Sequence, residues 1–135
     1  MLLLRAREAV LEPARPILRR HALTEAQWRV LRTLDVDGAM EATRLARAVF
    51  LHGSSLTRIV RDLAAKAYVA KRPDPQDGRV VLVAISPAGS AIVKELLPLI
   101  RAIAAQHRAA YGPEALDDLE DRLRKLIATA AGAGE

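Results

Sequence analysis

The segment LHGSSLTRIVRDLAA, residues 51–65, carries polar side chains at a spacing suited to an anionic partner. Its apolar residues recur three and four positions apart, which predicts an amphipathic helix. The predicted apolar stripe consists of Leu56, Ile59, Val60, Leu63 and Ala67. At about 100° per residue, Ser54, Thr57, Arg58 and Arg61 fall on the opposite face. That face offers short hydroxyls at its start and two guanidinium groups one turn apart, which suits a deep, negatively charged groove.

Duplex DNA is the partner for which these residue types are best suited. Arginine can form paired hydrogen bonds with O6 and N7 of guanine in the major groove, and hydroxyl groups can reach phosphates or base edges. The alternative is a capped helix face that only meets solvent. The candidate DNA-contacting residues on this helix are Ser54, Ser55, Thr57, Arg58 and Arg61.

A β-hairpin is predicted directly after this helix, because the β-prone runs YVAKR and RVVLVAI flank the turn-rich loop PDPQDG. Arg79 follows the Asp-Gly turn, and we expect it to reach the minor groove with Asp77 orienting it. A simple ion pair across the turn is the alternative, and both can hold together. Lys71 and Arg72, at the base of the hairpin, are predicted to contact phosphates without sequence preference.

Catalytic and metal-binding arrangements are not expected in this chain. Ser54 and Ser55 have no histidine near them in a nucleophile-elbow context, and the glycines do not form a phosphate-binding loop. The histidines at 21, 52 and 107 lack the spacing of metal ligands, and cysteine is absent. The sequence therefore predicts a protein that is not an enzyme and that uses neither a cofactor nor a metal.

The 135 residues are enough for one domain with a modest core. Ala, Leu and Arg recur throughout and aromatic residues make up 3%, so the predicted fold class is mainly α with a small β element. Residues 41–80 carry eight basic and four acidic side chains, and thus most of the net charge of +5. A basic middle between near-neutral ends indicates a phosphate-binding module between oligomerisation segments, although an arginine-rich solvated surface would give the same pattern.

The first residues, MLLLRAREAV, contain only three consecutive leucines before charges resume. This run is too short for a signal-peptide core or a membrane span. Because the lack of cysteine also suits a reducing compartment, we expect a cytoplasmic protein without a membrane partner.

Further helices are predicted before residues 51–65 and after the hairpin. Residues 2–20 have a helical pattern that Pro13 and Pro16 interrupt, so a kink or two short pieces is expected. A short helix at about 41–48 precedes residues 51–65 across a tight turn, which is typical of a helix-turn-helix.

The boundaries of three further helices are marked by local signals. Thr24 and Gln27 have the spacing of a capping box, and Leu23 and Trp28 that of a hydrophobic staple, so a helix begins at residue 25. Ser86 followed by proline starts a long helix that reaches about residue 111, and Gly-Pro at 112 and 113 precedes the last one.

This order of elements resembles the winged helix of the MarR family of bacterial transcription regulators. SSLTRIVRDLAAKAYVAKR is similar to the family's recognition helix and first wing strand. DGRVVLVAISPAG is similar to its wing signature, Asp-x-Arg followed by a strand and Leu-Thr-x-x-Gly, with Ile85-Ser86 in place of Leu-Thr. RPILRRHALTEAQWRVLRTL resembles the branch of regulators that control homoprotocatechuate and other aromatic-acid catabolic operons. The resemblance covers roughly residues 5–130.

The resemblance implies a homodimer that binds double-stranded operator DNA. Residues 1–22 and 87–135 would be dimerisation helices that interleave between the two chains, and residues 23–86 would be the winged helix that reads half of a pseudo-palindrome. The terminal helices also have more apolar positions than a monomer of this length can cover. One departure is Ser54, where relatives commonly have proline, so the turn before the recognition helix is more flexible.

The resemblance further implies an effector pocket between the dimerisation helices and the DNA-binding domain. In responders to aromatic acids, an arginine of the first helix pairs with the ligand carboxylate. Arg15 is the candidate here, with Arg19 and Arg20 nearby, and His21 and Trp28 could bond to and stack on a phenolic ring. The alternatives are that Trp28 belongs to the core through the staple and that each arginine forms an ordinary ion pair.

The sequence thus predicts a ligand-responsive repressor that a small aromatic carboxylate releases from its operator. The alternative is a winged helix that acts without ligand as an architectural or protein-interaction module. A protein-docking face is more often apolar than the Ser-Thr-Arg-Arg face found here, which favours DNA.

Overall fold

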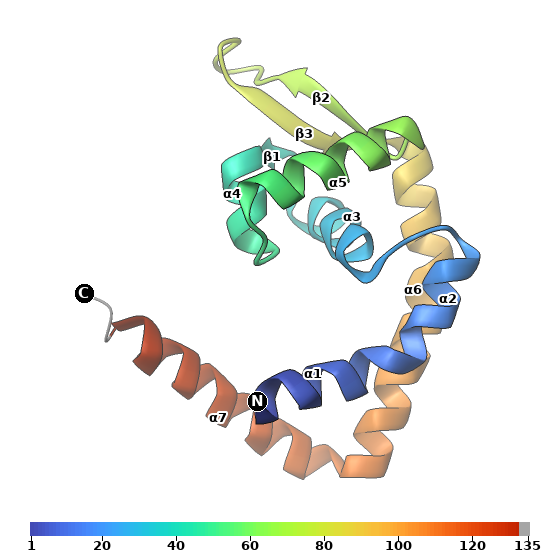
Figure 1. Ribbon diagram of the computed structural model, residues 1–135, viewed down its shortest axis with the longest axis vertical. Coiled ribbons are helices and arrows are strands. Elements are labelled where there is room, and N and C mark those ends of the chain that lie inside the picture. The colour runs from blue at the N-terminus through green and yellow to red at the C-terminus, as the bar shows by residue number, and fades with distance from the viewer. Residues whose placement is uncertain (133–135) are drawn as a thin grey trace. The chain divides into compact units, whose positions relative to one another are not determined.

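The computed structural model describes residues 1–132 (Figure 1). Residues 133–135, the end of the predicted C-terminal dimerisation segment, lie outside the described residues. The elements are α1 (Leu2–Leu11), a 3-10 turn η1 (Glu12–Ala14), α2 (Arg15–Arg20), α3 (Glu25–Asp37), β1 (Met40–Glu41), α4 (Ala42–Ala48), α5 (Gly53–Ala65), β2 (Val69–Pro73), β3 (Val81–Ile85), α6 (Pro87–Tyr111) and α7 (Pro113–Gly132). This mainly helical content with one small sheet confirms the predicted fold class.

The N-terminal helical segment is divided where its prolines predict. α1 ends at Leu11, η1 contains Pro13, and α2 begins with Pro16 in its first turn. Proline at a helix start is tolerated because its missing N–H would have no partner in the helix there. The expectation of short pieces is therefore confirmed.

The start of α3 is a complete capping box, as predicted. The backbone N–H of Gln27 donates to Thr24 Oγ1 at 3.1 Å, and the backbone N–H of Thr24 donates to Gln27 Oε1 at 3.1 Å. Gln27 is buried and uses its amide in this contact. The pair thus satisfies two backbone donors that the helix itself cannot.

We expect Thr24→Ala to lower the free energy of unfolding by about 1 kcal/mol, because it removes the acceptor for the Gln27 N–H. Urea unfolding followed by circular dichroism measures this loss. Thr24→Ser is the matched control, since it keeps the hydroxyl and should retain most of the stability. An equal loss in both variants would show that the methyl group, and not the cap, is the stabilising part.

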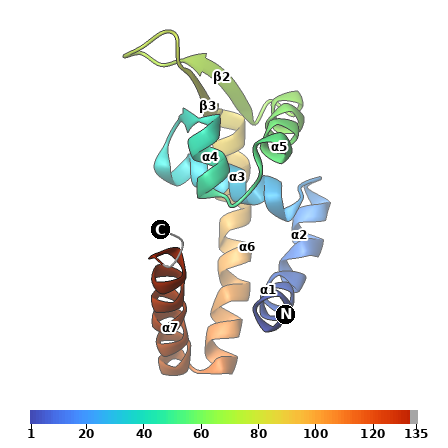
Figure 2. The same ribbon diagram turned by 60° about the vertical axis from the view of Figure 1, so that its left-hand side comes forward.

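The sheet has three antiparallel strands in the order β1-β3-β2. Met40 pairs with Val83 on one side of β3, and Lys71 pairs with Val83 on the other. β2 and β3 form the predicted hairpin, and Figure 2 shows it projecting beyond the helices α3, α4 and α5. β1 was not predicted, since two residues are too few to show an alternating pattern.

The core of residues 1–99 lies between α3, α4, α5, the sheet and the first part of α6. Its fully buried side chains include Leu31, Leu34, Leu45, Leu56, Leu63, Val83, Val93 and Leu96. α5 therefore cannot move away from this core without exposing leucine side chains to water.

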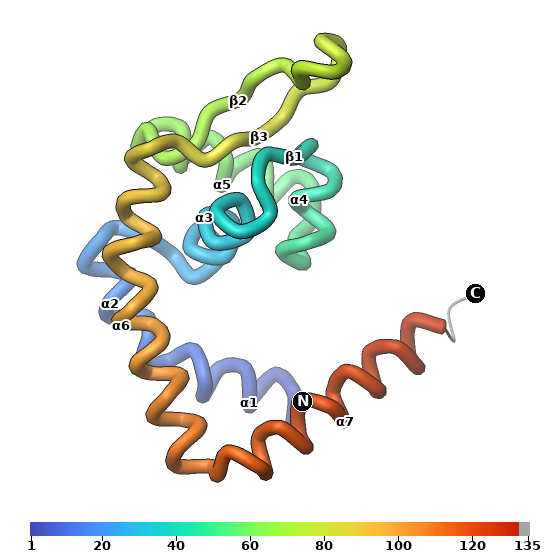
Figure 3. The backbone as a smooth tube through the Cα atoms, turned by 180° about the vertical axis from the view of Figure 1, so that it is seen from behind, coloured from blue at the N-terminus to red at the C-terminus, as the bar shows by residue number. Residues whose placement is uncertain are grey.

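Residues 100–132 form a separate unit, made of the end of α6 and of α7. Figure 3 shows the chain turning between α6 and α7. Gly112 lies between these two helices, and its φ of +101° favours glycine. Arg108 donates to both carboxylate oxygens of Asp117 at 2.8 and 2.9 Å. No described residue of α7 is buried, and Leu119, Leu126 and Ile127 are exposed. Across residues 1–132, no helix is both long enough and apolar enough to span a bilayer.

Candidate nucleic-acid interface

α5 has the two faces that its sequence predicts. Leu56, Val60 and Leu63 are buried, and Ile59 is partly buried. Ala67, predicted as the last member of this stripe, lies outside the helix and is exposed. The helix ends at Ala65, and Ala67 adopts a left-handed conformation with φ of +60°, so the stripe is one residue shorter than predicted.

The opposite face of α5 is solvent-exposed along its whole length. Its exposed residues are Ser54, Ser55, Thr57, Arg58 and Arg61. Thr57 Oγ1 donates to the carbonyl of Gly53 at 2.9 Å, which leaves its lone pairs free to accept. Arg61 is only 3.7 Å from Asp62, a loose surface pair, and Arg58 forms no ion pair with any residue between 1 and 132. Both guanidinium groups are therefore available to an external anion.

Ser54 stands where the resemblance predicts proline, and α5 is nevertheless a regular helix from its first residue. α5 begins at Gly53, and Leu56 N–H donates to the carbonyl of His52 at 3.0 Å. His52 provides no side-chain cap, so the first backbone N–H groups of α5 stay open to another acceptor.

The wing loop holds Arg79 at its outer end. Arg79 Nε and Nη2 donate to the two carboxylate oxygens of Asp77 at 3.0 and 3.1 Å, and this side-chain pairing holds the pKa of Asp77 below its ordinary value. The predicted ion pair across the turn is thus present. The Arg79 side chain is nevertheless 92% exposed, and its contact with DNA stays a prediction.

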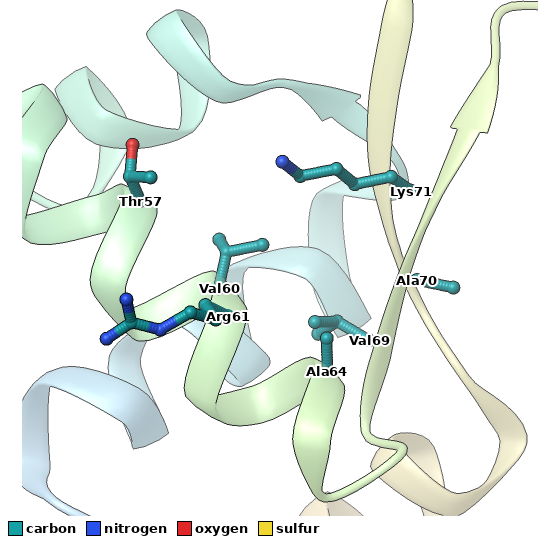
Figure 4. Close-up of a pocket in the computed structure, with 7 residues that line it drawn as sticks. All are labelled: Thr57, Val60, Arg61, Ala64, Val69, Ala70 and Lys71. Carbon is teal, nitrogen blue, oxygen red and sulfur yellow. The ribbon is translucent and has the colours of Figure 1, made fainter.

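A groove of about 470 Å³ lies between α5 and the first wing strand (Figure 4). Its lining residues are Thr57, Val60, Arg61, Ala64, Val69, Ala70 and Lys71. Lys71 extends from β2 toward α5, while Arg61 and Thr57 come from α5 itself. The structure therefore brings three of the predicted DNA-contacting residues to one groove with apolar walls. Arg72, the next residue of β2, is exposed at the same strand.

Arg15, the predicted effector-binding residue, is already paired with carboxylates of its own chain. Its Nη1 donates to Glu12 at 2.6 Å, and its Nη2 donates to Glu8. The bond from Arg15 lowers the pKa of Glu8. This arrangement matches the alternative of an ordinary ion pair, and a ligand carboxylate would have to replace one of the two glutamates.

His21 connects α2 to α6. Its Nδ1 lies 3.0 Å from the carbonyl of Ile17, and its Nε2 lies 3.1 Å from Glu95 Oε1. The bond to the Ile17 carbonyl, followed by the bond to Glu95, raises the pKa of His21. The ring is therefore held at both nitrogens, and protonation strengthens the contact with Glu95.

A small cavity of about 230 Å³ lies beside the start of α3. Its lining residues are Arg15, Leu18, Arg19, Leu23, Thr24 and Glu25. Within residues 1–132 this lining includes neither His21 nor Trp28, and Trp28 is half-buried on α3. Of the three predicted effector residues, the structure brings only Arg15 to this cavity.

The comparisons with known proteins agree with the geometry of α3, α4, α5 and the hairpin. The model of the MarR family matches residues 23–81. The homoprotocatechuate degradative operon repressor of Escherichia coli is 31% identical over 126 residues, which cover 93% of this chain and 85% of the relative. The chain belongs to the MarR family.

Two solved structures of similar proteins cover nearly the whole MarR-family chain. NadR in complex with 4-hydroxyphenylacetate is 28% identical, with a TM-score of 0.80 over 92% of this chain and 88% of NadR. BpsR of Bordetella bronchiseptica, whose DNA binding is regulated by 6-hydroxynicotinic acid, is 28% identical, with a TM-score of 0.82 over 93% of this chain and 90% of BpsR.

This MarR-family chain is a DNA-binding transcriptional regulator with a winged helix-turn-helix. α4 and α5 are the two helices of the motif, and β2 and β3 are the wing. The family and the named relatives are regulators of transcription and not enzymes.

One contact of the recognition helix was missed by the sequence analysis. Lys66, the residue that follows α5, donates its ammonium group to the carbonyl of Ala22 in the loop before α3. A lysine at a helix C-terminus is a recognisable signal for a carbonyl contact, but the distant partner is set by the tertiary fold. Lys66 therefore contributes to the placement of α5.

Proposed function

We propose that this MarR-family chain represses an operon for the catabolism of an aromatic carboxylic acid, in the cytoplasm and without catalytic activity of its own. One relative, 31% identical over 93% of the chain, is named as a repressor of a homoprotocatechuate degradative operon. NadR and BpsR, which share the fold at 28% identity, are described with a hydroxylated aromatic acid each. These names support the proposed class of effector. The proposed operator contacts are supported by the residue types and the exposure of α5 and the wing.

The observation that carries the proposal is the exposed polar face of α5 beside the wing. Two arginines and three hydroxyl residues lie on this face, and Lys71 and Arg61 line the same groove. We propose that Arg58 and Arg61 read base edges in the major groove, with Ser54, Ser55 and Thr57 at phosphates or bases. Lys71 and Arg72 would bind phosphates, and Arg79 would enter the minor groove.

The proposed repressor acts as a homodimer. Residues 1–22 and 87–135 would be its dimerisation segments and residues 23–86 its DNA-binding domain. The exposed apolar side chains of α1 and α7 support this division, because a second chain would cover them. Two recognition helices in such a dimer must lie about one turn of DNA apart, roughly 34–36 Å, to read both halves of a pseudo-palindrome.

The effector would act by changing this separation. We propose Arg15 as the residue that pairs with the aromatic carboxylate. His21 and Trp28 are proposed as further contacts of the ligand in the dimer, although neither lines the cavity beside Arg15 within one chain. The ligand carboxylate would take the place that Glu8 or Glu12 has in the free protein, since both already pair with Arg15. By linkage, a ligand that releases DNA must bind the free dimer more tightly than the DNA-bound dimer.

Arg15→Ala should leave operator affinity nearly unchanged and abolish release by benzoate-like acids. The measurement is a fluorescence titration of the operator complex with a panel of aromatic acids. Arg20→Ala is the matched control, because Arg20 belongs to α2 as well but does not line the cavity near Arg15. If no aromatic acid releases the wild-type protein, the effector class is wrong. If Arg15→Ala responds at the wild-type concentration, only the pocket assignment is wrong.

Sequence-specific binding separates this function from that of an architectural or protein-interaction module. A regulator should bind DNA upstream of its own operon far more tightly than random DNA of the same length, typically by 10³-fold or more. Equal affinity for both DNAs would favour the architectural module.

A further inference from the structure

Ser86, the residue before α6, is bonded to the turn that follows the recognition helix α5. Ser86 N–H donates to the carbonyl of Tyr68 at 2.9 Å, and Ser86 Oγ donates to the carbonyl of Ala67 at 2.6 Å. The same Oγ accepts from the N–H of Gly89 at 3.0 Å and so caps α6. One serine therefore serves two helices, and Figure 1 shows the start of α6 beside the end of α5.

The two carbonyls that Ser86 contacts are themselves fixed to α5. Ala67 N–H donates to the carbonyl of Ala64 at 2.9 Å, and Tyr68 N–H donates to the carbonyl of Leu63 at 3.0 Å. The left-handed conformation of Ala67 makes this closing turn possible. A displacement of Ser86 is thus passed to the last turn of α5 through two peptide groups that have little freedom.

Gly89 allows α6 to lie directly on the backbone of Tyr68. A Cβ at position 89 would be 2.2 Å from the carbonyl oxygen of Tyr68 and 2.7 Å from Ile85 Cγ1. The first of these neighbours is backbone and cannot turn away as a flexible side chain would. Any larger residue must therefore separate α6 from the end of α5.

We infer that Ser86 and Gly89 are positioning residues for DNA reading, which lock α5 to α6 so that both helices move as one rigid body. The inference rests on the proposed DNA-binding function. In the dimer, a rotation of α6 would turn the recognition helix and the wing by the same angle, because no flexible linker lies between them. These contacts of Ser86 and Gly89, called the lock below, thus convert a rotation of the dimerisation helix α6 into a change in the spacing of the two recognition helices.

The test separates the two bonds of the Ser86 side chain. Ser86→Asp keeps an acceptor for the Gly89 N–H, and aspartate is a favourable residue at this cap, but it cannot donate to Ala67. Ser86→Thr keeps both bonds. Ala88→Asp adds the same charge to an exposed position in the first turn of α6. Each protein is measured for melting temperature, for affinity to the operator and for affinity to random DNA.

Ser86→Asp should lose operator affinity by about 2- to 12-fold relative to Ala88→Asp, the range of one hydrogen bond, while its affinity for random DNA stays close to that of Ala88→Asp. Its melting temperature should fall below that of Ala88→Asp, because the same bond also stabilises the fold, so all affinities are measured well below the melting temperature of either protein. Ser86→Thr should behave as wild type. Operator binding by Ser86→Asp equal to that by Ala88→Asp would overturn the inference.

Hydrogen exchange of the free protein tests the lock without DNA. In Ser86→Asp, the amides of Ala67 and Tyr68 should exchange faster while that of Gly89 stays protected, and unchanged exchange at Ala67 and Tyr68 would overturn the inference. If wild type prefers no DNA sequence, the proposed function fails, and the exchange rates still decide whether the lock exists. Gly89→Ala should accelerate exchange at the same two amides.

Discussion

Leu63→Ala is expected to lower the free energy of unfolding by about 2 to 5 kcal/mol. Leu63 is fully buried on α5, where it packs into the core of residues 1–99. Alanine removes the transfer free energy of three carbon atoms and leaves a cavity that the surrounding helices can fill only in part. Urea unfolding at one fixed protein concentration measures the loss, since association also contributes to the stability of a dimer.

Leu63→Met is the control for this core position. Methionine keeps nearly the same volume, so its cost should stay below about 1.5 kcal/mol. An alanine variant as stable as the methionine variant would mean that Leu63 contributes little packing, and that α5 is held mainly by its termini.

Arg61→Ala is expected to weaken operator binding by about 1 to 3 kcal/mol and to change binding to random DNA little, which is the behaviour of a base contact. The physical reason is that Arg61→Ala removes the two hydrogen bonds that the guanidinium group would donate to O6 and N7 of an operator guanine. Random DNA does not present a guanine at a fixed position to Arg61, so there is no such pair of bonds to lose. Fluorescence anisotropy with both DNAs, at several salt concentrations, gives the comparison.

Lys71→Ala provides the contrast, since Lys71 lines the same groove from the wing strand. It should weaken binding to both DNAs and reduce the slope of the salt dependence by about one, as for a lost phosphate contact. Equal losses on both DNAs for Arg61→Ala would assign Arg61 to phosphate as well.

Features set by neighbouring residues could be predicted from the sequence. The capping box of Thr24 and Gln27 and the prolines that divide the first segment act within one helical turn. The apolar stripe of α5 follows from helical periodicity, and the mainly helical fold from composition.

The features that the sequence analysis missed depend on residues that meet only in the folded chain. β1 is two residues long and exists because β3 lies beside it. The end of α5 depends on Ala67 taking a left-handed conformation, which its residue type does not favour. The pairing of Arg15 with Glu8 could have been found from their separation of seven residues, two turns of a helix, had the prolines between them not suggested a break.

The state of α7 depends on how much of this regulator a cell contains. Since no described residue of α7 is fully buried within one chain, and only Leu116 and Leu123 among its leucines are partly buried, its apolar side chains gain most of their packing through association. Most helices in proteins owe their stability to such packing and not to their intrinsic propensity. At copy numbers below the dissociation constant of the dimer, dilution would remove the second half-site contact and the ordering of α7 at once. As the protein concentration decreases, occupancy of the operator would then fall more steeply than expected from losing the contacts of one half-site alone.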